Sequence, residues 1–240
     1  MVFIIAEAGI NHGGSISTAL NMIDAAADAG ADAVKFQSFT ADALGYDADL
    51  TALLRGCQLS RDDHYLLKNR ADVRGLEFMS TPFDADWCDF LVELGVKRLK
   101  ISSGKVKDTA FVKHVAARGL PVIMSNGMVD ELKFRIVVED YMKPVTDLTL
   151  LYCVSEYPTP LYRVNFEEMF NMMSLYNCKI GFSDHTCGIE SAIIAAASGA
   201  DVIEKHFTMD RALPGPDQCC SLMPNELWDM VQQIRKAEND

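Results

Sequence analysis

Short apolar runs alternate with amphipathic stretches along the chain, and this alternation constrains the fold more than any other feature. Each run is bounded by Gly, Pro, Asp or Asn. There are eight, at residues 3–8, 33–37, 77–81, 98–102, 121–125, 148–153, 179–183 and 202–207. Their near-continuous apolar character is typical of strands that are buried on both faces of a parallel sheet. The sequence therefore predicts eight such strands.

Helix-length segments separate several of these runs, at 15–31, 84–95, 108–119, 188–200 and 224–239. In the first, Ile16, Leu20, Ile23 and Ala27 recur at the spacing of one helix face, and Gly30 supplies a stop signal. Strand–helix alternation indicates parallel strands joined by right-handed crossovers. We therefore predict an α/β chain that forms a single (β/α)8 TIM-barrel domain over residues 1–240. An open doubly wound sheet is the alternative, although no G-x-G-x-x-G follows the first run.

Composition excludes several classes of function. The 240 residues carry a net charge of −12 and their basic residues are scattered, which argues against a nucleic-acid partner. The N-terminus lacks a basic region, and no apolar run reaches the ~18–20 residues of a membrane helix, so neither a signal peptide nor a membrane is expected. Seven cysteines without C-x-x-C spacing favour reduced thiols in a cytoplasmic protein.

Two histidines follow the last two predicted strands, His185 in "GFSDHT" and His206 in "EKHFT". Catalytic residues of a TIM barrel gather at the carboxyl ends of the strands, so these neighbouring imidazoles are expected to converge at the rim. Such a pair suits a divalent metal such as Mn²⁺ or Zn²⁺. The alternative is that each histidine only hydrogen-bonds the backbone. We favour metal ligation for the pair.

Two lysines, Lys35 and Lys100, lie inside apolar runs, where an ammonium group is unfavourable without an anionic partner. Hydroxyl groups follow neighbouring strands, so a pocket for phosphate or carboxylate is one interpretation. A Schiff-base lysine is the other, and the residues alone do not separate them. Glu7, near the end of the first run, is either a structural carboxylate or a general base.

Eight segments taken together resemble the sialic acid synthases, which condense phosphoenolpyruvate with an N-acetylated hexosamine. They run in the family's order over essentially the whole chain: "AEAGINHGG", "AVKFQ", "FMSTPFD", "KISSG", "MSNGM", "YPTP", "GFSDHT" and "EKHFTMDRALPGPD". The resemblance implies a TIM-barrel transferase that forms a carbon–carbon bond in carbohydrate biosynthesis. The expected product is a nonulosonic, or related 2-keto-3-deoxy, sugar acid, released with phosphate.

The resemblance also implies roles for individual residues. His185 and His206 look like ligands of a catalytic divalent metal, with Mn²⁺ the usual ion and Mg²⁺ or Co²⁺ the other candidates. Glu7 looks like an acid/base or water-positioning group. The phosphoenolpyruvate pocket is expected to comprise Lys35, Thr81, Lys100, Ser103 and Ser125, and contacts to the amino sugar or other aldose Gln37, Tyr157 and Asp217.

The chain departs from the family in three places. Lys105 stands where the family usually has glutamate, the segment 38–61 is short, and the sequence stops before the family's C-terminal antifreeze-like domain. These departures keep open the alternative of a catalytically altered barrel that acts as a sugar-binding or regulatory partner. An aldolase that forms an imine on Lys35 or Lys100 is the other alternative. The family commonly dimerises, so a homodimer through barrel helices is expected.

Overall fold

The structure is a computed structural model and describes residues 1–238. Each of the eight predicted runs forms a strand, and no predicted boundary is wrong by more than one or two residues. The strands are β1 Phe3–Gly9, β2 Ala33–Ser38, β3 Glu77–Pro82, β4 Leu99–Ile101, β5 Val122–Ser125, β6 Leu148–Cys153, β7 Lys179–Asp184 and β8 Val202–His206.

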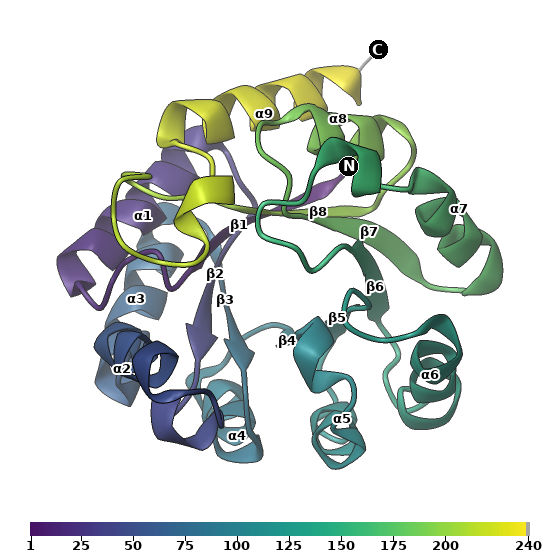
Figure 1. The fold of residues 1–240 in the computed structure, drawn as a ribbon, viewed down its shortest axis with the longest axis horizontal. Coiled ribbons are helices and arrows are strands. Elements are labelled where there is room, and N and C mark those ends of the chain that lie inside the picture. Colours follow the sequence, from purple (N-terminus) through teal and green to yellow (C-terminus); the bar gives the residue numbers. More distant parts are fainter. Residues whose placement is uncertain (239–240) are drawn as a thin grey trace.

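All recorded strand pairs are parallel, and the ladder runs β3-β2-β1-β8-β7-β6-β5-β4. The first strand pairs with the last, so the sheet curves into a ring with the helices outside it (Figure 1). The end strands β3 and β4 lie in contact across the remaining gap. The nearly closed TIM barrel is thereby confirmed, and the open doubly wound alternative is excluded.

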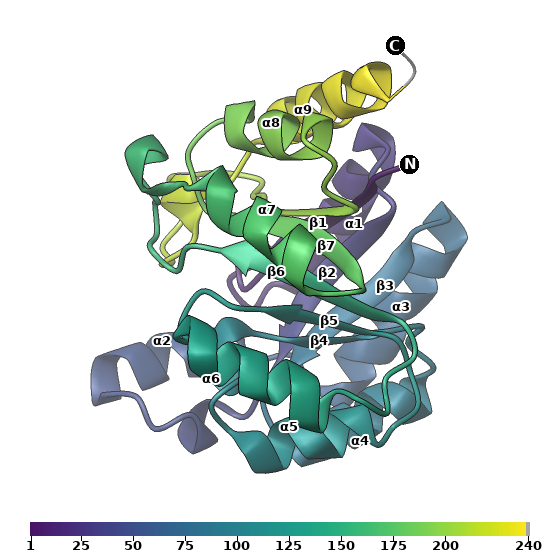
Figure 2. The same cartoon turned by 90° about the vertical axis from the view of Figure 1, so that its right-hand side faces the viewer.

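Helices surround this ring in both views (Figures 1 and 2). They are α1 Ile16–Ala29, α2 Ala48–Cys57, α3 Arg61–Arg74, α4 Ala85–Leu94, α5 Thr109–Ala116, α6 Glu131–Ile136, α7 Phe166–Leu175, α8 Glu190–Ala197 and α9 Pro224–Ala237. The five predicted helices correspond to α1, α4, α5, α8 and α9, and the predicted end at residue 239 lies outside the described residues. Segment 38–61 contains α2 and the short 3-10 turn Ala41–Ala43.

Side-chain alternation along each strand decides what fills the barrel. One layer of the interior is apolar and consists of Ile5, Ala33, Met79, Ile123, Leu151 and Val202. Two residues further along the same strands, the side chains are Glu7, Lys35, Thr81, Ser125, Cys153 and Glu204. The intervening residues, such as Ile4 and Val34, pack outward in the main core with the helices. The barrel interior therefore changes from apolar to polar toward the carboxyl ends of the strands.

One glycine in the first loop lets two segments approach closely. Gly14 has a φ of +79°, and a Cβ there would lie 1.9 Å from the backbone oxygen of Gly56 at the end of α2. Only glycine fits this position, so the β1–α1 loop is held against α2 at the rim. Within residues 1–238, none of the helices combines the length and apolar character needed to cross a membrane.

Candidate active site at the barrel mouth

The polar interior layer opens into a small cavity of about 60 Å³ at the carboxyl ends of the strands. Most of the side chains predicted as site residues line it: Glu7, Lys35, Gln37, Thr81, Lys100, Ser103, Ser125, Tyr157, His185 and His206. Asp217 is not among them, but its Oδ2 lies 3.9 Å from Nδ1 of His206. The structure therefore brings together groups from eight strands and the loops that follow them.

Lys35 lies between two buried carboxylates. Its Nζ is 2.9 Å from Oε2 of Glu7 and 3.6 Å from Oε2 of Glu204, and it donates a 3.0 Å hydrogen bond to Oγ1 of Thr81. The three charged side chains are less than a tenth exposed. Breaking such a buried cluster by removing one partner is strongly destabilising, so this arrangement fixes Lys35 at the cavity floor.

The second lysine shares one of these carboxylates. Nζ of Lys100 is 3.6 Å from Oε1 of Glu204 and donates a hydrogen bond to Oγ of Ser125. Oε1 of Glu204 also accepts a 2.9 Å hydrogen bond from Oγ of Ser183. Glu204 thus holds both ammonium groups on one side of the cavity, with hydroxyl groups around them. Two cations and several hydroxyl donors suit a small ligand that carries more than one negative charge.

Burial and neighbouring charges shift the pKa values of the two carboxyl groups, Glu7 and Glu204, in opposite directions. Burial raises the pKa of Glu7 to about 7, although Lys35 opposes it and Glu204 reinforces it. Burial also disfavours charge on Glu204, but Lys100 and Lys35 outweigh it and lower the pKa to about 2. One carboxyl group therefore stays ionised while the other exchanges a proton near neutral pH, which is the property required of an acid/base group.

The pKa values of the two lysines, Lys35 and Lys100, are also shifted in opposite directions. Burial disfavours the charged form of Lys35, but Glu204 and Glu7 outweigh it and raise the pKa. Burial lowers the pKa of Lys100, which has the single close carboxylate Glu204 and is repelled by Lys35. Lys35 is therefore the more firmly charged ammonium group of the pair.

The two histidines face each other at the top of the cavity, with ring centroids 5.4 Å apart. Nδ1 of His185 donates a 2.8 Å hydrogen bond to the backbone oxygen of Val154, so in the neutral ring the lone pair lies on Nε2. Burial disfavours charge on this ring, but Cys153 outweighs it and raises the pKa of His185, so a metal ion would have to displace a proton from Nε2. Nδ1 of His206 is buried and has no hydrogen-bond partner. Burial and the neighbouring His185 lower the pKa of His206 well below its ordinary value, so this ring is neutral. A neutral imidazole with an unpartnered buried nitrogen fits a metal ligand.

Aromatic and thiol groups surround the histidines. The ring of Tyr157 stacks on His185 at 4.1 Å between centroids and meets His206 edge-on at 5.9 Å. Sγ of Cys153 lies 3.7 Å from Nδ1 of His185. Burial opposes ionisation of this thiol, but His185 outweighs it and lowers the pKa of Cys153. Burial raises the pKa of Asp217, which is largely enclosed by the loop after β8.

Five cavity residues were given no role by the sequence analysis: Phe83 and Ser102 in the loops, and Cys153, Ser183 and Glu204 on the strands. Strand periodicity could have identified the last three, because Cys153, Ser183 and Glu204 share the interior face with Leu151, His185 and His206 respectively. Lys105 does not line the cavity. Its Nζ lies 2.9 Å from Oδ2 of Asp108 and 5.0 Å from the ring centre of Phe111, so this side chain is turned toward α5.

A second group of metal-binding side chains lies outside the barrel between α4 and α5, and comprises Cys88, Asp89 and His114. Oδ1 of Asp89 is already 2.8 Å from Nε2 of His114 and 3.1 Å from the guanidinium of Arg118. Burial raises the pKa of Cys88 to about 12, which disfavours the thiolate that a metal needs. The cationic Arg118 and the protonated thiol make this group a weaker metal site than the two histidines.

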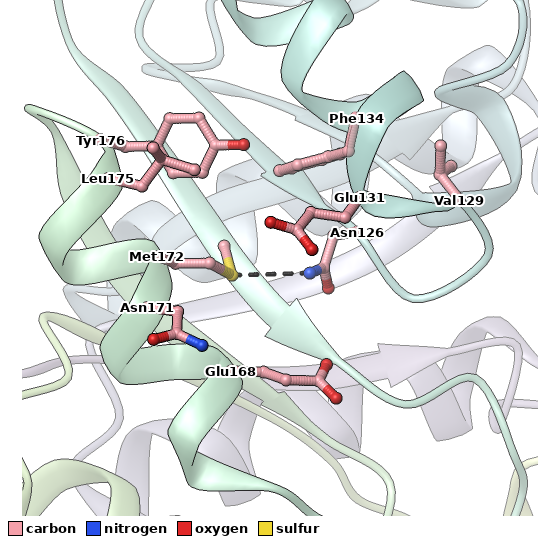
Figure 3. A pocket seen from close by; sticks show the side chains of 9 residues that line it. All are labelled: Asn126, Val129, Glu131, Phe134, Glu168, Asn171, Met172, Leu175 and Tyr176. Atoms are coloured by element: carbon pink, nitrogen blue, oxygen red, sulfur yellow. Dashed lines mark hydrogen bonds between the residues drawn. The ribbon is translucent and has the colours of Figure 1, made fainter.

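A larger cavity of about 310 Å³ lies between α6 and α7, away from the polar layer (Figure 3). Its walls include the apolar side chains of Phe134, Met172 and Leu175, and the amide of Asn126 donates to the sulfur of Met172 at 3.5 Å. None of the predicted site residues lines it. We therefore assign the candidate active site to the barrel mouth, where the titratable groups with shifted pKa values converge.

Comparison with known proteins identifies relatives of this chain. An N,N'-diacetyllegionaminic acid synthase of Legionella pneumophila is 44% identical over 98% of this chain and 72% of its own length. The N-acetylneuraminate-9-phosphate synthase of Homo sapiens is 32% identical over 98% of this chain and 70% of its own. A crystal structure of N-acetylneuraminic acid synthetase from Leptospira borgpetersenii superposes with a TM-score of 0.96 at 38% identity, and covers 99% of this chain and 84% of the other.

The family assignment follows from these matches. Residues 22–240 match the NeuB family. The match covers most of the chain, and the relatives named above are synthases of sialic or legionaminic acids. The resemblance found in the sequence, and the expectation of an enzyme of this kind, are confirmed. The chain belongs to the NeuB family of sialic acid synthase-like enzymes.

Proposed function

We propose that the barrel mouth condenses phosphoenolpyruvate with an N-acetylated aldose to form a nonulosonic acid and phosphate. The observation that carries this proposal is the pair of buried lysines, held by Glu204 beside two histidines that face each other. Two relatives named N,N'-diacetyllegionaminic acid synthase, 44% and 38% identical, support an acceptor with two acetamido groups.

Phosphate and carboxylate of the donor bind the lysine side of the cavity. Lys35, with Thr81, and Lys100, with Ser125, supply cations and hydroxyl groups, and Ser103 adds a further hydroxyl. Holding both substrates in one small cavity removes the entropic penalty of a bimolecular encounter.

In the reaction, the methylene carbon of the enol attacks the aldehyde carbon of the open-chain sugar, and the aldehyde oxygen takes up a proton. Water then adds at the carbon that bears the enol oxygen, and phosphate leaves. Glu7, with a pKa of about 7, is the group that exchanges a proton at this point. Lys35, 2.9 Å away, holds its carboxyl group in place.

His185 and His206 would hold a divalent metal, for which Mn²⁺ is our first candidate, with Mg²⁺ and Co²⁺ the others. When bound, such an ion acts as a Lewis acid on a carbonyl oxygen. Nδ1 of His206 has no hydrogen-bond partner, and His185 presents Nε2 because its Nδ1 donates to the backbone oxygen of Val154. Tyr157 covers both rings, and Gln37 and Asp217 lie at the rim where the sugar would bind.

The proposal is tested by phosphate release with phosphoenolpyruvate, Mn²⁺ and a panel of N-acetylated hexosamines and diacetamido sugars. Release is expected only when all three components are present. No release above background with any aldose of the panel would contradict the proposal. If phosphoenolpyruvate and sugar still bound by calorimetry, the result would favour a barrel that binds sugar without turnover.

The metal assignment is tested by removing each histidine. His185→Ala and His206→Ala should each sharply weaken Mn²⁺ binding, and the double variant should lose little more, because the two ligands act as one unit. His64→Ala is the control, since this side chain lies on α3 away from the cavity. His114→Ala, on α5, shows separately whether the second group of Cys88, Asp89 and His114 binds any of the Mn²⁺; we expect it to leave the binding unchanged. Unchanged Mn²⁺ affinity in both rim variants would remove the two-histidine site.

A second candidate is an imine-forming aldolase, which the lowered pKa of Lys100 favours because a neutral amine is the nucleophile. Borohydride treatment in the presence of pyruvate separates the two functions. The synthase should form no trapped adduct, whereas an aldolase should carry one on Lys100. Adduct formation that Lys100→Met abolishes would support the aldolase instead.

The setting of the enzyme is also part of our proposal. All seven cysteines are free thiols, which supports a reducing cytoplasm. A homodimer through barrel helices is the proposed assembly, and sedimentation at micromolar concentration that shows monomer alone would contradict it. The sequence range 1–240 is proposed to act as one catalytic domain.

A further inference from the structure

A fully buried ion pair lies directly behind the two histidines. Asp184 on β7 precedes His185, Lys205 on β8 precedes His206, and the two residues are register partners in the ladder. Nζ of Lys205 is 2.8 Å from Oδ2 of Asp184, and both side chains are 0% exposed. Because side chains alternate along a strand, this pair points out of the barrel while the histidines point in.

The hydrogen bonds of this pair enclose the segment that carries His185. Oδ1 of Asp184 accepts a 2.8 Å hydrogen bond from the backbone nitrogen of Thr186, and Nζ of Lys205 donates a 2.6 Å hydrogen bond to the backbone oxygen of Thr186. The residues before and after His185, Asp184 and Thr186, are therefore both bonded to the side chain of Lys205, which directly precedes His206.

The backbone ladder does not provide this connection. Recorded pairing between β7 and β8 ends at Asp184 and Lys205, one residue before the histidines. The backbone oxygen of His185 instead accepts from Thr159, and that of His206 accepts from Leu222. Each histidine is thus held by a different loop, and the ion pair is the direct link between their positions.

Fold stability alone does not account for an ion pair at this place. Burying two charges carries a desolvation penalty that well-packed apolar residues avoid, so such pairs are weak contributors to stability. The pair instead fixes the relative positions of the two strand ends, because charge-assisted hydrogen bonds are short and directional whereas apolar contacts are not.

We infer that Asp184 and Lys205 are positioning residues that set the separation of His185 and His206 for metal binding. This inference rests on the proposed metal site. The pair touches neither metal nor substrate, and acts through the backbone of the residues that do. It should therefore govern metal affinity more than donor affinity.

The test uses a variant that removes both charges and keeps the shapes, Asp184→Asn with Lys205→Met. An asparagine oxygen still accepts from Thr186, and no buried charge is left unpaired, so the fold should be retained. Without substrates, Mn²⁺ binding measured by calorimetry should weaken about tenfold or more, the range typical of groups that orient metal ligands. The electron paramagnetic resonance spectrum of bound Mn²⁺ should change, and excess Mn²⁺ should restore turnover.

The control removes a less buried ion pair at the other end of the barrel, Glu77→Gln with Arg98→Met. Arg98 pairs with Glu77 at the start of β3 and packs over Phe3, far along the strands from the histidines. This variant should alter thermal stability and leave Mn²⁺ affinity unchanged. Wild-type Mn²⁺ affinity and spectrum in the Asp184/Lys205 variant would overturn the inference alone. Absence of Mn²⁺ binding by the wild-type protein would instead refute the metal site, and the inference with it.

Discussion

Acidification should destabilise this barrel through one histidine in the first loop, His12. The side chain is 2% exposed, and its Nδ1 accepts a 3.1 Å hydrogen bond from the backbone nitrogen of Gly14. Burial, with a smaller contribution from the nearby His64, lowers the pKa of His12 from 6.5 to about 4. The folded protein therefore keeps this ring neutral at a pH where the unfolded chain protonates it.

The sign and size of the effect follow from proton linkage. Between pH 6.5 and 4 the unfolded state binds more protons at this position, so the free energy of unfolding falls as the pH falls. Each pKa unit corresponds to about 1.4 kcal/mol, which gives a total near 3 kcal/mol for His12 and about 2 kcal/mol by pH 5. Glu7 acts in the opposite direction, because its raised pKa of about 7 favours the folded state as the pH drops. A whole-protein pH profile would mix the two.

Comparison with His12→Gln isolates the contribution of His12. Urea unfolding of both proteins at pH 7.5 and pH 5 should show that the wild type loses about 2 kcal/mol more than the variant over this interval. Any packing defect of the variant is present at both pH values and drops out of the difference. Equal losses in the two proteins would refute the assignment of this acid sensitivity to His12.

Two further substitutions test the packing of the mouth. Lys35→Met leaves Glu7 and Glu204 without their shared cation, so it should reduce the free energy of unfolding by about 3–5 kcal/mol and abolish phosphoenolpyruvate binding. Lys68→Met, which removes a surface ion pair with Asp72 on α3, is the control. Similar losses of stability in the two variants would contradict the role of the buried cluster. Gly14→Ala should be clearly more destabilising by urea unfolding than Gly13→Ala, because both have positive φ but only Gly14 faces a backbone oxygen at 1.9 Å; equal effects would argue against the close approach.

The sequence predicted the strands well because each is an uninterrupted apolar run between loop residues. The helices α2, α3, α6 and α7 were not delimited. The clearest case is α3, "RDDHYLLKNRADVR", which has few apolar residues and begins at the capping box of Ser60 and Asp63. Burial of Leu67 and Ala71 against the barrel is a tertiary contact that the local pattern hardly shows.

The candidate site was predictable to the extent that its members stand in recognisable motifs. Glu204 was passed over because, read alone, it is one charged residue in "VIEKHF", whereas the structure shows that it holds both Lys35 and Lys100. The direction of Lys105 could not be read from the sequence, because its ion pair with Asp108 depends on the turn between them. The site roles remain predictions that the experiments above would test.

The two end strands of the ladder, β3 and β4, link the stability of the barrel to the binding of substrate. Within residues 1–238 the ladder ends at β3 on one side and β4 on the other. Thr81 and Lys100, which both line the proposed donor pocket, stand on these two strands, one on each side of the seam. A ligand that binds both residues would connect β3 to β4, the two neighbouring strands between which the described part of the ladder has no backbone hydrogen bonds. Donor binding should then stabilise the barrel against opening between β3 and β4, because the free energy of binding adds to the free energy needed to separate these strands.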